Sequence, residues 1–300
     1  MDDMGRGPFD ELRPLLFTIA YQILGSAADA EDVVQDSYFR WRETDPRTVE
    51  HPRAYLTQTV TRQSLNRLRS LRRRREEYVG NWLPEPIRTE HDASHDVLLA
   101  ESVSMAMLLV LETLGPAERA VFVLSEVFGH SLVEIAELID KTPATVRQIA
   151  HRARAHVQAR RKRFEPDSET SRAVIAQFMR ASRTGDVQAL MEVLAPDVVQ
   201  LTDGGGVVTA ARHPIAGADA VARYLIGLAR GPMSAMSYEF CTFNALPAIV
   251  CRSEADGTID TIQLIEIDAG RITGLYAVRN PEKLHTTQVV RILHRDRGHS

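Results

Sequence analysis

The stretch from Ser131 to Val157, SLVEIAELIDKTPATVRQIAHRARAHV, carries the start and stop signals of two short consecutive helices. Ser131 and Glu134 fit the S-x-x-E capping box, in which each side chain accepts a hydrogen bond from a backbone N–H that the helix start leaves unpaired. Thr142 is a good N-cap for a second helix, and Pro143 suits its first position. The spacing predicts a helix-turn-helix, whose two helices are joined by a tight turn.

The second of these helices is predicted to have a core face and an outward face that suits DNA. The residues expected to face the core are Val146, Ala150, Ala153 and Val157. The outward candidates for DNA contact are Thr145, Arg147, Gln148, His151, Arg152 and Arg154. Arginine and glutamine can make two hydrogen bonds to a base edge, whereas Arg154 and the basic run from Arg160 to Arg163 suit phosphates. A plain helical hairpin is the alternative, but the caps, the proline and the arginines together favour DNA binding.

The first 79 residues predict helices only. Leu12, Leu16, Ile19 and Ile23 recur at helical spacing, and Gly25 is expected to end that first helix. The next helix, DAEDVVQDSYFRWRE, has carboxylates in its first turn, where they suit the positive end of the helix dipole. By itself, this acidic pattern fits an ordinary surface helix equally well.

A third helix, which begins near Pro52, is predicted to present a basic face. The side chains that step along this face are Tyr55, Thr59, Arg62, Asn66, Arg69 and Arg73. The residues expected to pack inward are Leu56, Val60, Ser64, Leu68 and Leu71, and Leu65 does not fit that set. A solvated basic face is one interpretation. The aromatic, threonine and asparagine side chains among the arginines also suit contact with bases.

The segment from Tyr78 to Asp96 lacks periodicity and contains two prolines, which predicts a flexible linker. Fully extended, the roughly 17 residues between Gly80 and Val97 reach about 55 Å, or roughly one and a half turns of duplex. Trp82 is expected to dock on a neighbouring surface. Helices resume near Val97 and break at Gly115.

The pattern changes after Pro166, where a helix, a Gly-Asp turn, a second helix and a strand are followed by alternating strands. Helices followed by an antiparallel sheet predict an α+β domain. This domain is expected to run from Ser171 to about Leu284, and the final RILHRDRGHS is expected to be frayed.

Composition excludes several classes of protein. The net charge of −4 argues against a protein that coats nucleic acid indiscriminately, although basic runs occur at 72–75 and 160–163. No apolar run approaches the ~20 residues of a membrane span, and the acidic N-terminus is unlike a signal peptide, so a cytoplasmic protein is expected. Cys241 and Cys251 match no metal or redox motif and are expected to be buried thiols. Neither a metal nor a cofactor is predicted.

The first 164 residues resemble a bacterial RNA polymerase sigma factor of the extracytoplasmic-function type, which has two sigma domains joined by a linker. The resemblance implies that DAEDVVQDSYFRWRE contacts the core polymerase through Asp32, Gln35, Asp36 and Trp41. It implies that TDPRTVEHP and the helix from Tyr55 capture and melt the −10 promoter element. It further implies that TPATVRQIAHRARAHV recognises the −35 element. An opened strand needs its bases held, and a basic groove with aromatic side chains can do this.

The C-terminal part resembles the SnoaL-like, NTF2-like cone that one subgroup of these sigma factors carries. The motifs are WLPEP at 82–86, DGGG at 203–206 and NPEKL at 280–284. Glu282 stands where the subgroup has aspartate, and Val207 stands where a basic residue often follows the glycines. The resemblance implies that this extension regulates the sigma domains of its own chain. Because glycines allow close backbone approach, our hypothesis is that the loop 204–206 lies against the linker, and a plain strand-end turn is the alternative. The expected regulatory contacts are Trp82, Pro84, Asp203, Gly204, Gly205, Gly206, Asn280 and Pro281.

These interpretations predict a multidomain fold: two all-α sigma domains, the second a helix-turn-helix, followed by an α+β NTF2-like cone. The predicted segments are region 2 (1–79), the WLPEP linker (80–96), region 4 (97–164), a second linker (165–170), the cone domain (171–285) and the tail (286–300). The expected partners are core RNA polymerase, promoter DNA and an unknown small molecule in the cone domain, and the free chain is expected to be a monomer.

Two other functions remain open at this point. A SnoaL-like isomerase or cyclase would need an acid or base in a dry pocket. The candidates for that role are Asp203, His213, Tyr238, Glu239 and Glu266, among which no spacing singles out a pair. A one-component DNA-binding regulator with a ligand-sensing cone is the second alternative, but such a protein does not need the acidic helix and the second basic helix. A sigma factor without enzymatic activity is therefore favoured.

Overall fold

The computed structural model describes residues 7–45, 48–89, 96–160, 169–231, 235–287 and 289–295. The chain divides into two compact units, each of which is built from segments that are far apart in the sequence. The first unit comprises residues 1–76, 107–161 and 291–300, and the second comprises residues 77–106 and 162–290. This division differs from the predicted segments, because residues 77–106 group with the C-terminal part of the chain.

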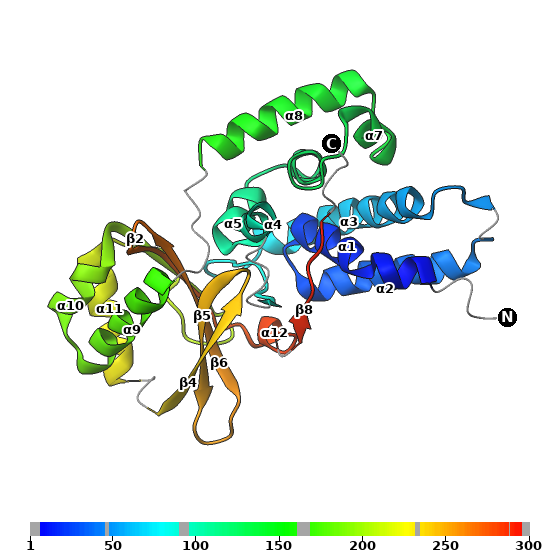
Figure 1. The fold of residues 1–300 in the computed structure, drawn as a ribbon. Coiled ribbons are helices and arrows are strands. Elements are labelled where there is room, and N and C mark those ends of the chain that lie inside the picture. The colour runs from blue at the N-terminus through cyan, green and yellow to red at the C-terminus, as the bar shows by residue number, and fades with distance from the viewer. Residues whose placement is uncertain are drawn as a thin grey trace. The chain divides into compact units, whose positions relative to one another are not determined.

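Three helices form the N-terminal part of the first unit: α1 (Gly7–Leu24), α2 (Ala27–Glu43) and α3 (Pro52–Glu76) (Figure 1). Gly25 ends α1 with a φ of 67°, a conformation that glycine adopts without strain. Ser26 caps α2, because its hydroxyl accepts a hydrogen bond from the backbone N–H of Asp29 at 3.1 Å. The predicted end of α1 at Gly25 is therefore confirmed.

The inward face of α3 is wider than its spacing predicts. The residues that were predicted to pack inward and are buried are Leu56, Val60, Ser64 and Leu68. Leu65, which does not fit that set, is buried as well, and Leu71 is only half-buried. Both α1 and α2 contact α3, so α3 buries more than one stripe of side chains.

The helix-turn-helix follows the predicted pattern closely. Its elements are α5 (Met105–Glu112), α6 (Pro116–Phe122), the π-helical turn η3 (Val123–Val127), α7 (Leu132–Leu138) and α8 (Pro143–Gln158). Ser131 Oγ accepts from Glu134 N at 3.2 Å, and Glu134 Oε2 accepts from Ser131 N at 2.7 Å. Thr142 Oγ1 accepts from Thr145 N at 3.2 Å. All four predicted core residues of α8 are buried, together with Ile149.

Residues 291–295 also belong to the first unit. The Arg291 guanidinium forms an ion pair with Glu31 and lies 5.0 Å from the centre of the Phe17 ring. The backbone N–H of His294 donates to the hydroxyl of Thr18 at 3.1 Å. The prediction of a frayed tail is wrong for residues 291–295, because these contacts hold the segment on α1 and α2.

The second unit is an α+β domain. Its helices are α4 (Val97–Val103), α9 (Glu169–Thr184), α10 (Val187–Val193), α11 (Ala218–Arg230) and α12 (Pro281–Leu284). Its strands are β1 (Arg88–Thr89), β2 (Leu194–Asp203), β3 (Ile215–Ala216), β4 (Met236–Phe243), β5 (Leu246–Ser253), β6 (Ile259–Asp268) and β7 (Arg271–Val278), and β8 (Val290–Arg291) spans the division between the units. The strands form one sheet in the order β3-β2-β7-β6-β5-β4-β1-β8, in which β2 and β7 are parallel.

Helices α9, α10 and α11 lie on one face of this sheet (Figure 1). Strand residues alternate between the two faces, so Ile265 and Ile267 of β6 join the core under these helices. Ile249 of β5 and Leu275 of β7 belong to the same core. The predicted fold class, all-α domains followed by an α+β cone, is confirmed.

The predicted flexible linker is instead packed into the second unit as far as Thr89. Every residue from Leu83 to Ile87 is buried, and β1 pairs with β4 through Arg88 and Phe243. The expectation of a tether free to extend by about 55 Å is therefore wrong for residues 81–89. Proline-rich sequence without periodicity rules out a helix here, but it does not show that another segment covers it. Residues 90–95, and most of the predicted second linker, lie outside the described residues.

Candidate nucleic-acid interface

The predicted −35 face of α8 is mostly available to a ligand. Arg147, Gln148, His151 and Arg152 are exposed, and Arg152 retains 62% exposure of its side chain beside Glu118. Arg147 and Gln148 lie in the second turn of α8, and His151 and Arg152 lie in the third. Arginine and glutamine at these positions can reach base edges, and arginine also suits phosphates.

The other two of the six predicted −35 residues, Thr145 and Arg154, are half-buried. The Thr145 hydroxyl lies 2.8 Å from that of Thr142. Arg154 Nε donates to Glu126 Oε1 at 2.7 Å. Within the basic run that follows α8, Arg160 is exposed, whereas residues 161–163 lie outside the described residues.

The predicted −10 residues on α3 do not form one uniformly exposed face. Tyr55 and Thr59 are half-buried, and the Tyr55 hydroxyl lies 3.1 Å from that of Thr44. Asn66 and Arg69 are exposed and hydrogen-bonded to each other at 3.1 Å. The side chain of Arg73, and residues 46 and 47 of the preceding loop, lie outside the described residues.

Arg62, the remaining −10 candidate, is bound to the helix-turn-helix. Its Nε donates to the carbonyl of Leu138 at 3.1 Å, and its Nη2 donates to the carbonyl of Glu137 at 3.3 Å. Gln58 donates to the same Glu137 carbonyl at 3.3 Å. The last carbonyls of a helix lack intrahelical partners and carry the negative end of its dipole, so a guanidinium suits them well. Arg62 therefore contacts protein where DNA contact was predicted.

The predicted polymerase-binding residues of α2 divide into two groups. Asp32, Gln35 and Asp36 are exposed on one face. Trp41, in contrast, is buried at 3% exposure, and its ring centre lies 5.8 Å from that of Tyr55. The expectation that the Trp41 side chain contacts the polymerase is corrected here, because this side chain packs α2 against α3.

The sequence reasoning missed Phe39, which extends the exposed face of α2. Its side chain is 49% exposed, one of the large apolar side chains that the described residues leave in water. Phe39 lies seven residues after Asp32, four after Gln35 and three after Asp36, so all four share one stripe of the helix. The i+7 spacing was the signal in the sequence that could have identified it. An exposed aromatic residue beside carboxylates is typical of a protein-binding surface.

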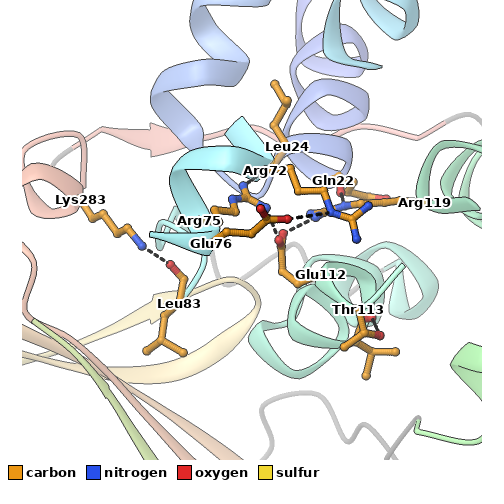
Figure 2. Close-up of polar contacts among 11 residues, drawn as sticks. Gln22, Leu24, Arg72, Arg75, Glu76, Leu83, Glu112, Thr113, Arg119 and Lys283 are labelled. Carbon is orange, nitrogen blue, oxygen red and sulfur yellow. Dashed lines mark hydrogen bonds and ion pairs between the residues drawn. The ribbon is translucent and has the colours of Figure 1, made fainter. Parts of the chain in front are cut away.

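A cluster around Glu112 joins α1, α3, α5 and α6 within the first unit. Figure 2 shows the Arg75 and Arg119 guanidiniums directed at the Glu112 carboxylate, with which both form ion pairs. Arg75 Nη2 also donates to the carbonyl of Leu24 at 2.5 Å, and Arg119 Nε donates to that of Gln22 at 2.9 Å. Burial lowers the pKa of Arg75, although attraction to Glu112 opposes this effect. Sequence reasoning missed this cluster, because its members are distant in the chain.

In the second unit, Asp203 holds the linker. Its Oδ1 accepts from the Tyr78 hydroxyl at 2.5 Å and from Gly205 N at 3.0 Å. Its Oδ2 accepts from Leu83 N at 2.9 Å and from Lys283 Nζ at 2.7 Å. Asp203 is fully buried, so these four donors supply the stabilisation that water would otherwise give its charge. Burial and the bond to Asp203 raise the pKa of Tyr78 well above its ordinary value, which keeps its phenol as a donor.

Lys283 connects the NPEKL motif to WLPEP. Its Nζ donates to the carbonyl of Leu83 at 2.5 Å, as Figure 2 shows, and lies 4.3 Å from the centre of the Trp82 ring. Asn280 Nδ2 donates to the Tyr78 hydroxyl at 2.9 Å. Pro84 is buried, whereas Pro281 is exposed at the first position of α12. The structure thus brings together the three motifs that the sequence singles out, and the regulatory role of their residues stays a prediction.

The glycines of DGGG permit this close approach. Gly205 has a φ of 66°, and a Cβ there would lie 2.6 Å from the Asn280 side chain. Gly206 has a φ of 73°, and a Cβ there would lie 3.1 Å from Cβ of Val79. Gly204 belongs to the same turn, where its carbonyl accepts from Val207 N at 3.0 Å. A larger residue at position 205 would push the loop away from Asn280.

A second anchor for the linker, at Asn244, was not predicted. Asn244 and Ala245 form the two-residue turn between β4 and β5, with φ angles of 52° and 56°. The buried Asn244 side chain accepts from Ile87 N at 3.0 Å and donates to the carbonyl of Val103 at 2.8 Å. Asparagine tolerates this left-handed conformation, so an Asn-containing hairpin turn was the available signal.

Comparisons with known proteins bear on all of these surfaces. Residues 9–74 match the family described as Sigma-70 region 2, and residues 104–157 match Sigma-70, region 4. The ECF RNA polymerase sigma factor SigJ of Mycobacterium tuberculosis is 35% identical over 292 residues, which cover 92% of this chain and 91% of SigJ. The chain belongs to the extracytoplasmic-function sigma factors.

The similarity extends through the C-terminal domain of this sigma factor. The probable ECF RNA polymerase sigma factor SigI of Mycobacterium tuberculosis is 31% identical over 283 residues, which cover 91% of this chain and 92% of SigI. The crystal structure of Mycobacterium tuberculosis SigJ matches with a TM-score of 0.75 and 32% identity, covering 93% of this chain and 98% of that one. The match includes the cone domain as well as the sigma regions.

The five candidate catalytic residues of this sigma factor do not gather at one site. Tyr238 alone among them lines the cavity of the cone domain. The Asp203 carboxylate accepts hydrogen bonds from Tyr78 and Leu83 of the linker. The buried Glu266 carboxylate accepts a hydrogen bond from the Tyr276 hydroxyl at 2.7 Å. Glu239 pairs with Arg88 and Arg252, and His213 is exposed. The geometry therefore assembles no acid–base pair from these residues.

The cysteines of the sigma factor are free thiols. Cys251 is buried, as expected, and burial raises its pKa to about 12. Cys241 is only half-buried, which corrects the expectation, because β4 leaves part of it in contact with water. Within the described ranges, no three His, Cys, Asp or Glu side chains are grouped so that they could hold a metal ion. None of the described helices is both long and apolar enough to span a bilayer.

Proposed function

We propose that this sigma factor binds core RNA polymerase through the exposed face of α2 that contains Asp32, Gln35, Asp36 and Phe39. Carboxylates around an aromatic residue supply charge complementarity and an apolar anchor on the same surface. The exposure of Phe39 is the observation that supports this face most directly. Trp41 then contributes indirectly, by fixing α2 on α3.

Substitution of Phe39 by alanine is expected to weaken binding to purified core polymerase by about 2 kcal/mol, or roughly thirtyfold in Kd. The reason is the loss of an aromatic anchor that is not needed for folding, since half of the side chain is in water. Fluorescence anisotropy of labelled full-length protein titrated with core enzyme measures the effect. Val187→Ala, at an exposed apolar residue of α10 in the other unit, is the control. Equal affinity of both variants would rule out this face.

We propose further that α8 recognises the −35 element and that α3 contacts the melted −10 element. The four exposed residues in the second and third turns of α8 support the first assignment. For α3, the exposed pair of Asn66 and Arg69 supports a direct role, whereas Arg62 must first leave the carbonyls of α7. DNA contact by Arg62 therefore requires that its hydrogen bonds to α7 open.

Arg147→Ala is expected to reduce affinity for a cognate −35 sequence by about 1–3 kcal/mol and to relax specificity at one base pair. Arg160→Ala is expected to weaken binding to all sequences alike, since this exposed residue lies beyond α8 and suits a phosphate. Mobility-shift titrations with core enzyme, at several salt concentrations and with single-base-pair variants, distinguish the two. If Arg147→Ala lowers affinity for every sequence equally, Arg147 contacts the backbone alone.

We propose that the cone domain regulates the sigma regions of its own chain and that its cavity takes a small molecule. The observation that carries the first part is the burial of the linker from Leu83 to Ile87 in the second unit. Residues 77–89 follow region 2 directly and precede region 4, so their docking limits how far the two regions can separate. Release of the linker is then the regulated step.

Transcription in vitro tests the proposed function as a whole. Purified protein and core polymerase should initiate at defined start sites on a promoter library, and a deletion of residues 169–300 should change the output. Binding to DNA without binding to the core enzyme would instead indicate a one-component regulator. Turnover of a small molecule by the isolated protein would support the isomerase alternative.

A further inference from the structure

One cavity of the cone domain, the one that Tyr238 lines, lies between helices α9 and α11 and the sheet. Its volume is about 80 Å³, several times the volume that one water molecule needs. Its apolar wall is formed by Phe178, Leu225, Leu228, Ile249 and Ala277. Its polar lining includes Ser182, Gln200, Thr202, Thr261 and Gln263. A cavity with an apolar wall and a small number of polar groups is the usual form of a small-molecule site.

Gln200 is the unusual member of this lining. It is 1% exposed, and its Nε2 donates to the carbonyl of Leu201 at 3.0 Å and lies 3.3 Å from the Thr202 hydroxyl. Its Oε1 has no hydrogen-bond partner within the described part of the chain, and neither has the buried hydroxyl oxygen of Ser182. Buried polar atoms without partners are few in native proteins. Both residues line the same cavity, so a molecule bound there is one source of the missing hydrogen bonds.

The charged residues of the lining are Asp260, Arg279 and Arg183, of which the first two pair with each other. Asp260 accepts from Arg279 at 2.8 Å and 3.1 Å and from the Thr261 hydroxyl at 2.5 Å. Burial alone would raise the pKa of Asp260, but these bonds outweigh it and lower the pKa, so the pair stays ionised and neutral overall. Cys251 is a neutral thiol because burial raises its pKa to about 12. Arg183 is exposed to water, which screens its charge.

We propose that this cavity binds a small uncharged molecule that has an apolar body and a hydroxyl group, with the hydroxyl donating to Gln200 Oε1. The inference rests on the proposal that the cavity takes a small molecule and does not depend on polymerase or promoter binding. Arg279 is already paired with Asp260 and the charge of Arg183 is screened by water, so an anion would gain little in this cavity. A pure hydrocarbon would leave the Gln200 oxygen unsatisfied. The hydroxyl of the ligand is therefore the feature that the site selects.

The site is also placed to act on the linker. Thr202 lines the cavity, and the next residue of β2 is Asp203, which holds Leu83 N. Arg279 lines the cavity, and Asn280 beside it bonds to Tyr78. Occupancy of the cavity is expected to change hydrogen exchange of the Leu83 amide at least threefold. Unchanged exchange at saturating ligand would overturn this coupling while leaving the binding site intact.

Phenol, toluene and benzoate test the proposed ligand class, because they share a ring and differ in the group attached to it. Ligand-observed NMR on the purified full-length protein is expected to give phenol an affinity about tenfold above that of toluene, the effect of one hydrogen bond, with no binding of benzoate. Gln200→Met removes the acceptor at similar volume. This variant is expected to lose the preference for phenol while still binding toluene, a change that general destabilisation does not produce.

Gln188→Met, at an exposed glutamine of α10, is the matched control and should keep the preference for phenol. Ala229→Phe, on the half-exposed lining of α11, should abolish binding of both phenol and toluene, and it serves if Gln200→Met fails to fold. Equal affinity of the wild-type protein for phenol and toluene would overturn the hydroxyl assignment. Binding of benzoate alone would overturn the uncharged class. Binding of none of the three would overturn the cavity as a ligand site, without bearing on the sigma function.

Discussion

Substitution of Glu112 by glutamine is expected to lower the free energy of unfolding of the first unit by about 3–5 kcal/mol. The Glu112 carboxylate pairs with both Arg75 and Arg119, and Arg119 is only 1% exposed. Without this negative charge, two largely buried guanidiniums face each other. No attraction to a carboxylate then offsets the free-energy cost of removing their charges from water. Glutamine has nearly the same shape, so the loss reports the charge rather than a cavity.

Urea denaturation followed by far-UV circular dichroism measures this change, provided that the two units give separate transitions. Glu43→Gln, at an exposed carboxylate of α2, is the control and should change stability by less than about 0.5 kcal/mol. A loss below about 1 kcal/mol for Glu112→Gln would show that the cluster does not stabilise the unit. The same variant should loosen the contact between α3 and α7, so Arg62 becomes free and binding to a single-stranded −10 sequence increases.

Local chemistry explains which parts of this fold could be predicted. The caps at Ser131 and Thr142 and the glycine at position 25 act within a few residues, so the sequence specifies the helix ends that they form. Burial depends on neighbours that are distant in the chain. Trp41 and Phe39 illustrate the difference: both are aromatic residues of one helix, but only Trp41 faces α3. Helical spacing from the exposed carboxylates distinguishes them, while residue type alone does not.

At the candidate site, too, contacts between residues that are far apart in the sequence could not be predicted. The motifs around Trp82, Asp203 and Asn280 were visible as patterns, but their contacts span 120 or more residues. Glu112 and Arg119 lie in no motif. The bonds from Arg119 to Gln22 and from Arg75 to Leu24 follow only from the packing of four helices. The orphan oxygen of Gln200 was likewise invisible, because an absent partner leaves no trace in a sequence.

In the second unit, substitution of Asp203 by asparagine is expected to lower the free energy of unfolding by about 3–5 kcal/mol. Lys283 then keeps a buried ammonium with the Leu83 carbonyl as its hydrogen-bond acceptor and with the ring of Trp82 beside it. The asparagine NH2 group also places a fifth hydrogen-bond donor where four donors already converge, so these donors compete for too few acceptors. Since two of those donors belong to Tyr78 and Leu83, the linker should leave the domain before the domain unfolds.

Hydrogen exchange followed by mass spectrometry on the full-length protein tests this order of events. Peptides that cover residues 77–89 should exchange at least tenfold faster in Asp203→Asn, while peptides from β5 and β6 change less. Asp197→Asn, at an exposed carboxylate of the same strand, should leave both sets unchanged. Lys283→Met is expected to cost less than Asp203→Asn, because the carboxylate retains three donors. If instead all peptides of the second unit accelerate together, Asp203 stabilises the whole domain, and the linker has no separate release step.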